Sequence, residues 1–427
     1  MSQSMYEIIK HLFPICRSIT GPGIQKSLLY FEKLVPNFKR IKFKSGSKVF
    51  DWKIPKEWHV KNGYISGLNK KKYAEFKKNN LHLLNFSRPI KKRVSRKELF
   101  KHLYTLKKQP NSIPYVTSYY KKNWGFCMTE NQKKKLREKF YDVLIDSKFK
   151  SGNLNLSHAV FKGKSKKEIF FSSYLCHPSM ANNELSGPAV LIKLAEYIKN
   201  KKKLNFTYRF VLLPETIGSI CYINKFKESL KKNMICGFNL SCVGDDKAYS
   251  HIESRSGNTL ADISLEEALK GKKNVKRYSF LRRGSDERQY CSPGVDLPVC
   301  GFSRSKYGEF PEYHTSKDNL NFISKNGLKN SFEVMRSIID TFEKNYYWNS
   351  FPKSNILCEP NLGKRNLYPT VSQKKNYGNL NLRMDLIAYS DGKKNLIEIS
   401  RIIKQPLNKI FSELKLLKKN KIISIAK

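Results

Sequence analysis

The segment YLCHPSMANNELSG, residues 174–187, brings metal-binding and hydrogen-bonding side chains close together in the chain. It follows the apolar run EIFFSSYLC and contains His177, Asn183 and Glu184 ahead of a Ser-Gly pair. Imidazole and carboxylate groups are ligands that Zn²⁺ binds in proteins. A loop of this composition directly after a predicted buried strand therefore indicates a candidate metal site.

Further acids and a second histidine follow the later apolar runs. The motif PETIGS contains Glu215, NLSCVGDD contains Asp245, RRGSDERQY contains Asp286, and GEFPEYHTSKDN contains His314. Ligands of α/β sheets bind beyond the carboxyl ends of the strands, so these side chains could share one pocket. A glutamate beside a bound metal can act as a general base toward water.

Each of these residues also has a simpler structural explanation. A histidine at a strand end, such as His177, is more often a hydrogen-bonded turn residue, and Glu215 could cap the helix that follows it. Asp286 could belong to a solvated ion-pair turn, and His314 to an ordinary loop. Five such groups at successive strand ends of one domain nevertheless favour a functional site.

The apolar runs that position these residues alternate with helical patterns over residues 106–347. EIFFSSYLC, NFTYRFVLLPE, MICGFNLSCVG and VDLPVCGFSR are continuous apolar segments, typical of strands that are covered on both faces. Segments with helical spacing separate them, which predicts an α/β sheet with helices on both faces. Residues 1–45 begin with two helical segments, and we expect them to belong to the same domain.

Two other parts of the chain have a different pattern. Residues 46–105 are aromatic, alternating and interrupted by turn residues, which predicts short strands in a small, inserted β-rich domain. Residues 348–381 are rich in Pro and Asn and are expected to form a connector.

Residues 382–427 show the order helix, turn, helix, short turn, helix and strand, which is typical of a winged helix-turn-helix. Such modules bind DNA, pack against proteins or dimerise. A helix that reads DNA bases should present Arg, Asn or Gln to their edges. The segment QPLNKIFSELKLLKKN carries lysines but no arginine, and its Leu/Ile spacing indicates packing. We therefore favour protein contacts, such as a homo-oligomer, over nucleic-acid binding, which stays open.

Composition narrows the class of protein. The 427 residues are 40% hydrophobic and 12% aromatic, which excludes a disordered chain. The net charge of +47 comes mainly from lysines that are dispersed along the chain. We therefore favour a compositional bias over nucleic-acid binding as its explanation. The nine cysteines contain no CxxC pair, which argues against a disulfide framework or a zinc knuckle. The chain lacks long apolar runs and a signal-peptide pattern, which predicts a cytoplasmic protein with no membrane partner.

The motifs CHPSMANNELSG, PETIGS, NLSCVG, GSDERQY and EYHTSKDN resemble, in this order, those of zinc-dependent aminopeptidases. Over nearly its full length the chain resembles aminopeptidase-like proteins that have an inserted β domain and a C-terminal winged helix. These proteins often occur in bacterial surface-polysaccharide gene neighbourhoods. The resemblance implies a zinc-exopeptidase-like fold with a mostly parallel or mixed sheet.

The resemblance also implies roles for individual residues. His177 and His314 match the two metal-binding histidines of the aminopeptidases. Glu215 matches the catalytic base, and Asp286 matches the aspartate of the Ser-Asp motif near the site.

Three positions depart from the aminopeptidase pattern. Asn183, Thr216 and Ser241 stand where the family has carboxylate ligands. Two zinc ions would face too little negative charge, so we expect one Zn²⁺ per chain at most. Three protein ligands and a water make an adequate catalytic site. Besides the two histidines, Glu184 is the expected third ligand, and Asp286 is the reserve candidate.

The expected activity is hydrolysis of an amide by a single-zinc, aminopeptidase-like mechanism with Glu215 as the base. The substrate would be a peptide or an amide-bearing small molecule, for example an amide on a sugar or nucleotide-linked intermediate. The residues expected to contact it are Asn183, Tyr313, Arg283, Arg304, Glu309 and Glu312, the last two as candidates for binding a free amine.

Two further expectations stay open at this stage. Arg17, Arg282 and Arg283 could bind an anionic group of the substrate, although surface arginines are commoner. The missing ligands and the positive charge also suit a second class of function. In that alternative, the chain is a catalytically degenerate sensor or scaffold whose winged helix contacts DNA or protein.

Overall fold

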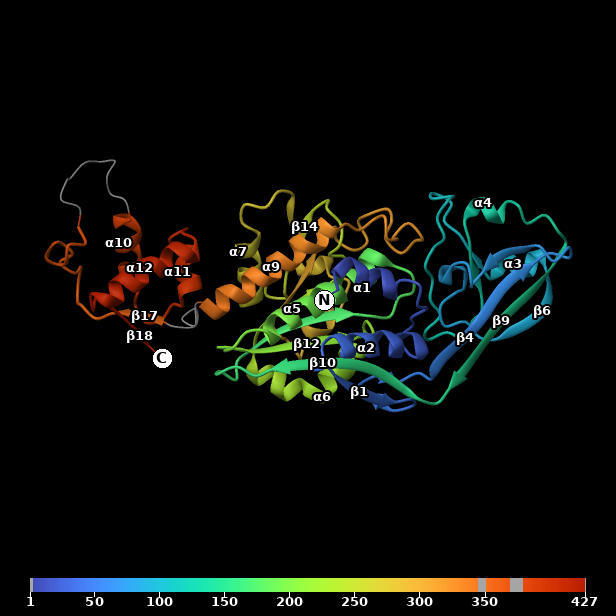
Figure 1. The fold of residues 1–427 in the computed structure, drawn as a ribbon, viewed down its shortest axis with the longest axis horizontal. Helices are drawn as coiled ribbons and strands as arrows, with labels where there is room; N and C mark the ends of the chain where they lie inside the picture. The colour runs from blue at the N-terminus through green and yellow to red at the C-terminus, as the bar shows by residue number, and fades with distance from the viewer. Residues whose placement is uncertain (1–2, 345–350, 369–378, 427) are drawn as a thin grey trace. The chain divides into compact units, whose positions relative to one another are not determined.

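The computed structural model describes residues 3–344, 351–368 and 379–426 (Figure 1). The chain divides into two compact units, Met1–Arg336 and Ser337–Lys427, and each is described by itself. Residues 345–350 and 369–378, which include parts of the predicted closing helix and connector, lie outside the described residues.

The first unit is built on an eight-stranded mixed sheet with the order β1-β10-β12-β11-β13-β16-β14-β15. The four central strands are parallel, whereas β10 and β14 pair antiparallel with their inner neighbours. The strands are β1 (Lys39–Lys44), β10 (Asn153–Phe161), β11 (Glu168–Tyr174), β12 (Thr207–Leu213), β13 (Met234–Leu240), β14 (Tyr249–Ile252), β15 (Val275–Tyr278) and β16 (Val299–Ser303). The predicted mixed α/β fold is confirmed.

Helices cover both sides of this sheet. Figure 1 shows α5 and α6 on opposite sides of its strands. Every residue of β11 and β12 is buried, which explains their continuous apolar runs. The helices of this part are α1 (Met5–Leu12), α2 (Pro22–Leu34), α5 (Ser186–Lys199), α6 (Ile217–Asn233), α7 (Leu260–Leu269), α8 (Glu287–Tyr290) and α9 (Lys325–Lys344).

A second sheet has four antiparallel strands in the order β5-β4-β9-β6. Three of them, β4 (Glu57–Ser66), β5 (Lys72–Glu75) and β6 (Ile90–Ser95), come from the predicted β-rich segment 46–105. The fourth, β9 (Phe140–Lys150), lies beyond that segment and pairs with both β4 and β6. Its buried and less buried residues alternate, as in a strand with one face on the core. The small sheet therefore reaches to residue 150.

The rest of the inserted part consists of short elements and loops. These are β2 (Lys48–Val49), β3 (Trp52–Lys53), α3 (Arg96–Lys101), β7 (Leu103–Tyr104), β8 (Phe126–Cys127) and α4 (Glu130–Lys133). Between β7 and β8 the chain contacts the loop that carries His314. Ile113 N donates to Ser316 Oγ at 3.0 Å, and Ser316 N donates to Ile113 O at 2.9 Å.

The second unit contains α10 (Leu380–Ala388), α11 (Leu396–Ile402) and α12 (Leu407–Lys419), followed by β18 (Ile423–Ala426). This order agrees with the predicted winged helix-turn-helix. β18 pairs antiparallel with β17 (Phe351–Ser354), which comes from the range that the sequence predicts as a connector. The three helices share a core to which Leu386, Leu396, Ile399, Ile410 and Leu414 contribute.

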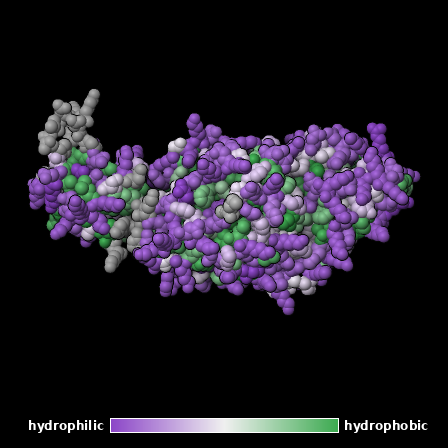
Figure 2. All heavy atoms as spheres, in the orientation of Figure 1, coloured by the Kyte–Doolittle hydropathy of each residue, from purple (hydrophilic) through white to green (hydrophobic). Residues whose placement is uncertain are grey.

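Hydrophilic residues cover most of the visible face in Figure 2, with apolar residues scattered between them. None of the helices in the described ranges combines the length and the apolar character that crossing a membrane requires.

Candidate active site

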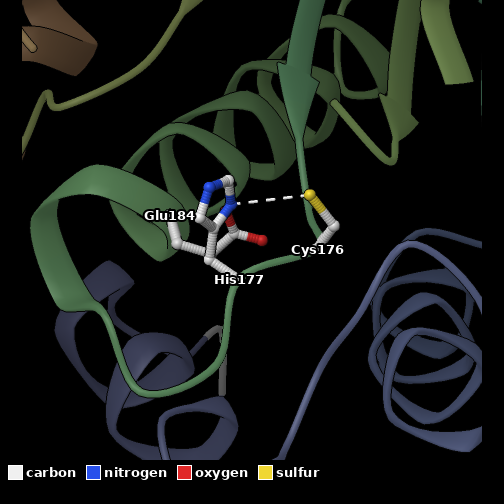
Figure 3. Close-up of side chains that lie close together, drawn as sticks. All are labelled: Cys176, His177 and Glu184. Atoms are coloured by element: carbon white, nitrogen blue, oxygen red, sulfur yellow. Dashed lines mark hydrogen bonds and ion pairs between the residues drawn. The ribbon is translucent and has the colours of Figure 1, made fainter. Parts of the chain in front are cut away.

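His177 and Glu184 lie in the loop between β11 and α5, where they form a buried cluster with Cys176 (Figure 3). His177 Nδ1 lies 2.6 Å from Glu184 Oε2 and 3.5 Å from Cys176 Sγ. A carboxylate only accepts hydrogen bonds, so Nδ1 carries the proton of the shorter contact. Burial lowers the pKa of His177, but the charges of Glu184 and Glu215 outweigh it and leave this pKa raised. The second ring nitrogen, Nε2, lies on the side of Glu215.

The loop around this cluster is held by one buried carboxylate. Asp318 accepts hydrogen bonds from the backbone N–H groups of Ala181, Asn182 and Asn183 at 3.1, 2.6 and 2.8 Å. The same residues begin a single π-helical turn, Ala181–Leu185, that leads into α5. Burial raises the pKa of Asp318 to about 7, although these hydrogen bonds act in the opposite direction. The clamp fixes the backbone from which Glu184 projects.

Arg17 supports the cluster from the N-terminal segment. Its Nε donates to the carbonyl oxygen of His177 at 2.9 Å and lies 3.9 Å from Glu184 Oε1. Both side chains are fully buried, so Glu184 has a compensating positive charge in a place without water. Arg17 therefore belongs to the interior of the site, where its Nη2 has no hydrogen-bond partner.

Glu215 follows β12, and its Oε2 lies 3.8 Å from His177 Nε2. Burial raises the pKa of Glu215, and His177 and Arg288 offset only part of this effect. The next residue, Thr216, has a φ of 65°, which is strained for a β-branched residue. Asp286 Oδ1 holds this turn by accepting a hydrogen bond from Thr216 N at 2.7 Å. Burial and the charge of Glu215 raise the pKa of Asp286 to about 8.

His314 lies opposite His177, with 5.2 Å between the two ring centroids. Its φ is 54°, and its carbonyl oxygen accepts a hydrogen bond from Tyr115 N at 2.8 Å. Burial, with a smaller contribution from His177, lowers the pKa of His314 well below its ordinary value. Tyr313 stacks on the His314 ring at a centroid distance of 3.9 Å. A neutral imidazole in this position is suited to metal binding.

Tyr115 and Tyr119 close the site from the inserted part of the chain. The Tyr115 ring lies 4.8 Å from that of His177 and 5.2 Å from that of His314. The two tyrosine hydroxyls are 2.6 Å apart, and burial raises the pKa of both well above the ordinary tyrosine value. Both therefore stay protonated at neutral pH. Neither tyrosine was among the residues predicted from the sequence, although the aromatic run YVTSYY was a visible signal.

Several polar atoms of the site are buried and have no hydrogen-bond partner. Those that could bind a cation include Glu184 Oε1, Asp286 Oδ2 and His314 Nε2, whereas the unpaired Arg17 Nη2 and Arg288 Nε are N–H donors that could not. Leaving such atoms unpaired costs about 1–3 kcal/mol each. The carboxylate oxygens and the imidazole nitrogen are atoms of the kinds that zinc binds, so their residues fit a cation.

The predicted ligands do not all fall into one group. Among the described residues, the ligand atoms that lie within 4.8 Å of one another here belong to Cys176, His177 and Glu184. Burial raises the pKa of the Cys176 thiol well above its ordinary value, which disfavours a thiolate ligand. The 2.6 Å between His177 Nδ1 and Glu184 Oε2 suits a hydrogen bond, because two ligands of one zinc ion lie roughly 3.3 Å apart. Asn183 Oδ1 already accepts a hydrogen bond from Tyr174 OH at 2.8 Å.

A second buried group, His251, Asp262 and Cys300, has a structural explanation. Asp262 accepts hydrogen bonds from Ser254 and Thr259 and from His251 Nε2 at 3.0 Å. These contacts outweigh burial and lower the pKa of Asp262 to about 2. The carboxylate is already saturated with donors, so this group needs no metal.

The other residues predicted to contact substrate lie in varied surroundings. Arg304 is 3% exposed, stacks on Tyr249 at 3.8 Å and donates to Ala248 O. Arg283 is exposed and donates to Phe280 O. These contacts are structural ones for Arg304 and leave Arg283 at the surface.

The two glutamates proposed for a free amine also have partners. Glu309 accepts hydrogen bonds from Tyr278 OH at 2.6 Å and from Arg282 Nη2 at 3.1 Å. Glu312 lies 3.4 Å from Lys247 Nζ and lines a cavity of about 570 Å³ between residues 109–112 and 311–322. Glu309 lines a separate cavity of about 510 Å³, so both glutamates border an open volume.

A family described as "Domain of unknown function (DUF4910)" matches residues 6–345, and a winged helix-turn-helix family matches residues 350–425. The second match begins at the strand that the sequence analysis had included in the connector.

Similar individual proteins include one from Clostridium acetobutylicum, "Putative polysaccharide biosynthesis protein with aminopeptidase-like domain". It is 40% identical over 93% of this chain and 90% of its own length. A crystal structure of a "putative peptidase" from the same organism has a TM-score of 0.89 at 36% identity, covering 99% of this chain and 96% of that one. A zinc aminopeptidase from Bacillus subtilis has a TM-score of 0.58 at 16% identity, covering 80% and 94%. The aminopeptidase-like fold is thereby confirmed.

Proposed function

Because the chain belongs to the DUF4910 family and carries an aminopeptidase-like domain, we propose that it is a zinc-dependent amide hydrolase with one metal ion. The observation that carries this proposal is the buried pair of histidines. His177 and His314 face each other across 5.2 Å, with Glu215 3.8 Å from His177 Nε2. Unpaired buried donor atoms beside them support a cation there.

The chain's own residues suggest how zinc would be held. His177 would offer Nε2 and His314 would offer Nε2, its unpaired ring nitrogen. Asp286, whose Oδ2 is also unpaired, is the reserve carboxylate ligand. When bound, a zinc ion supplies a Lewis acid that polarises a carbonyl and makes water more acidic.

We propose that Glu184 is a positioning residue and not the third ligand that the sequence suggested. Histidines that bind metals commonly donate their second ring N–H to a carboxylate, which fixes the tautomer. Glu184 occupies that position on Nδ1, and Arg17 supplies the positive charge beside it. This arrangement directs Nε2 of His177 toward Glu215.

Glu215 is proposed as the general base. Its raised pKa brings a carboxylate closer to the pKa at which proton transfer at neutral pH is efficient. It would accept a proton from the attacking water and deliver it to the leaving amine. The Tyr115–Tyr119 wall would exclude bulk water from this exchange.

The substrate class is proposed as a peptide or an amide-bearing small molecule. The Clostridium acetobutylicum relative is named as a polysaccharide biosynthesis protein. An amide on a sugar-linked or nucleotide-linked intermediate is therefore an additional candidate. The cavity beside Glu312 would accommodate a group of the substrate outside the histidine pair.

Elemental analysis of the purified full-length chain tests the proposal. We expect about one zinc per chain, lost in His177→Ala and in His314→Ala. Glu184→Gln should retain zinc with a weaker affinity, by roughly 10–100-fold, because it removes a positioning contact. Two metals per chain would contradict the mononuclear site, and a metal-free wild-type protein would contradict the hydrolase.

A second candidate function is a degenerate sensor or scaffold. The amide of Asn183, which replaces a carboxylate ligand of the aminopeptidases, is hydrogen-bonded to Tyr174. This contact favours a site that has adapted to the absence of a metal-bridging group. A wild-type chain that binds no zinc but folds normally would support this alternative.

A further inference from the structure

We propose that Arg288 binds a carboxylate or phosphate group of the substrate beside Glu215. The substrate would then be an amide that also carries an anionic group. The assignment to a substrate rests on the proposed function, whereas the anion site itself rests on the contacts of Arg288.

Arg288 lies in the short helix α8 and contacts the turn that carries the proposed base. Its Nη2 donates to Thr216 Oγ1 at 2.6 Å, and Thr216 directly follows Glu215. The side chain is half-buried, so one side of it can still be reached. This contact positions the guanidinium next to the reacting part of the site.

The guanidinium has no anionic partner. No carboxylate of the described residues forms an ion pair with Arg288, and its buried Nε has no hydrogen-bond partner. A partly desolvated charge without such contacts is unfavourable. An incoming oxyanion would supply both, because carboxylate and phosphate groups match the planar N–H donors of arginine.

The neighbouring acids are engaged elsewhere. Glu287 accepts hydrogen bonds from Gly284 N, Ser285 N, Asn239 Nδ2 and Tyr307 OH. Asp286 Oδ1 accepts from the Thr216 backbone and from Ser219 Oγ at 2.8 Å. Neither carboxylate forms an ion pair with Arg288, although Asp286 Oδ2 has no hydrogen-bond partner.

The other candidate arginines are less suitable for this role. Arg17 is fully buried with Glu184, and Arg282 is paired with Glu309. Arg283 is exposed and donates to a backbone carbonyl. Arg288, in contrast, contacts Thr216, the residue next to Glu215, and its Nε has no hydrogen-bond partner.

Calorimetric titration with inorganic phosphate tests the anion site in the full-length, metal-free chain. Ionic strength is held constant with sodium chloride, because the chain carries a net charge of +47. We expect Arg288→Met to weaken phosphate binding at least tenfold, as the loss of a charge-assisted contact should. The matched control Arg137→Met removes an exposed arginine to which no role in the site is assigned and should change the affinity less than twofold.

Arg288→Lys provides a second variant if Arg288→Met does not fold. It keeps the charge but loses the planar pair of donors, and we expect at least threefold weaker binding. Succinate in place of phosphate shows whether a carboxylate or a phosphate is preferred. Equal phosphate affinity in wild type and in the folded Arg288 variants would overturn the site, as would a wild-type chain without a saturable phosphate site.

The zinc content of the same wild-type preparation keeps the two proposals apart. A chain that never binds zinc but loses phosphate affinity in Arg288→Met would contradict the hydrolase and retain the anion site. A zinc-binding hydrolase whose phosphate affinity is unchanged in Arg288→Met would retain the hydrolase and contradict the anion site.

Discussion

His177 shows how buried charges determine which atom of a side chain is available. Glu184 occupies Nδ1 of the ring, and Arg17 stabilises Glu184 from the other side. The same carboxylate therefore controls both the charge and the orientation of the imidazole. A change at Arg17, which never reaches solvent, should consequently affect the site through His177.

Glu215→Gln tests the proposed general base directly. The amide cannot accept the proton of the attacking water, so we expect kcat to fall roughly 10²–10⁴-fold. Zinc content should not change, because His177 and His314 remain. Kinetics on a responsive amide substrate and elemental analysis of the same sample check this result. A variant that retains full kcat would exclude Glu215 as the base.

At the scale of elements, α5 depends on a close approach at its first turn. A Cβ at Gly187 would lie 2.5 Å from the carbonyl oxygen of Leu240 and would also clash with Ser173 Oγ. We expect Gly187→Ala to lower the free energy of unfolding by about 1–3 kcal/mol, as overpacking does. Gly363→Ala is the control, since its Cβ would meet only the Asn361 side chain at 3.5 Å. Denaturant unfolding of both variants measures the difference.

Asp262 links the start of α7 to acid stability. Its folded-state pKa of about 2 lies below the ordinary aspartate value, so its charged form stabilises the fold above the unfolded-state pKa near 4. This contribution, roughly 2 kcal/mol, should disappear as the pH falls from about 4 to about 2. Asp262→Asn should be destabilised at pH 7 and should approach the wild type near pH 2. A difference that does not depend on pH would contradict this explanation.

The sequence predicted the central elements better than their partners. Continuous apolar runs predicted the buried strands β11 and β12. The motifs that follow these runs predicted His177 and Glu215 as site residues. The sequence did not assign β9 to the small sheet, because an alternating strand can pair with the edge of either sheet. β17 was missed because four residues among Pro and Asn carry no periodic signal.

The sequence also did not predict how several residues contribute to the site, for a similar physical reason. Arg17, Tyr115 and Arg288 reach the site through tertiary contacts, and their local sequence does not show which residues they will meet. Glu309 was expected to contact substrate, and its local sequence does not show that Tyr278 of β15 and Arg282 of the following turn bind it. The residue types in the sequence indicated a metal-dependent reaction. The folded structure is needed to show which charged side chains already have a partner of opposite charge.

At the scale of the whole molecule, the net charge of +47 should produce weak, unspecific attraction to nucleic acid. We expect unrelated DNA duplexes to bind with equal affinity at low salt. That affinity should fall about 10³-fold or more between 50 and 200 mM salt, because counterion release drives it. Fluorescence anisotropy on several duplexes measures both effects. A strong preference for one duplex would instead support a DNA-reading role for the winged helix.

Hydrogen bonds join residues 113–115 to residues 314–316, so two parts of the chain contribute residues to the site. The large sheet supplies the groups proposed for chemistry, and the inserted part supplies the Tyr115–Tyr119 wall that faces them. Relatives could therefore differ in substrate selectivity through changes in the Tyr115–Tyr119 wall while they keep the proposed reactive groups. Exchange of the insertion between relatives is accordingly a route to new selectivity that leaves the underlying reaction intact.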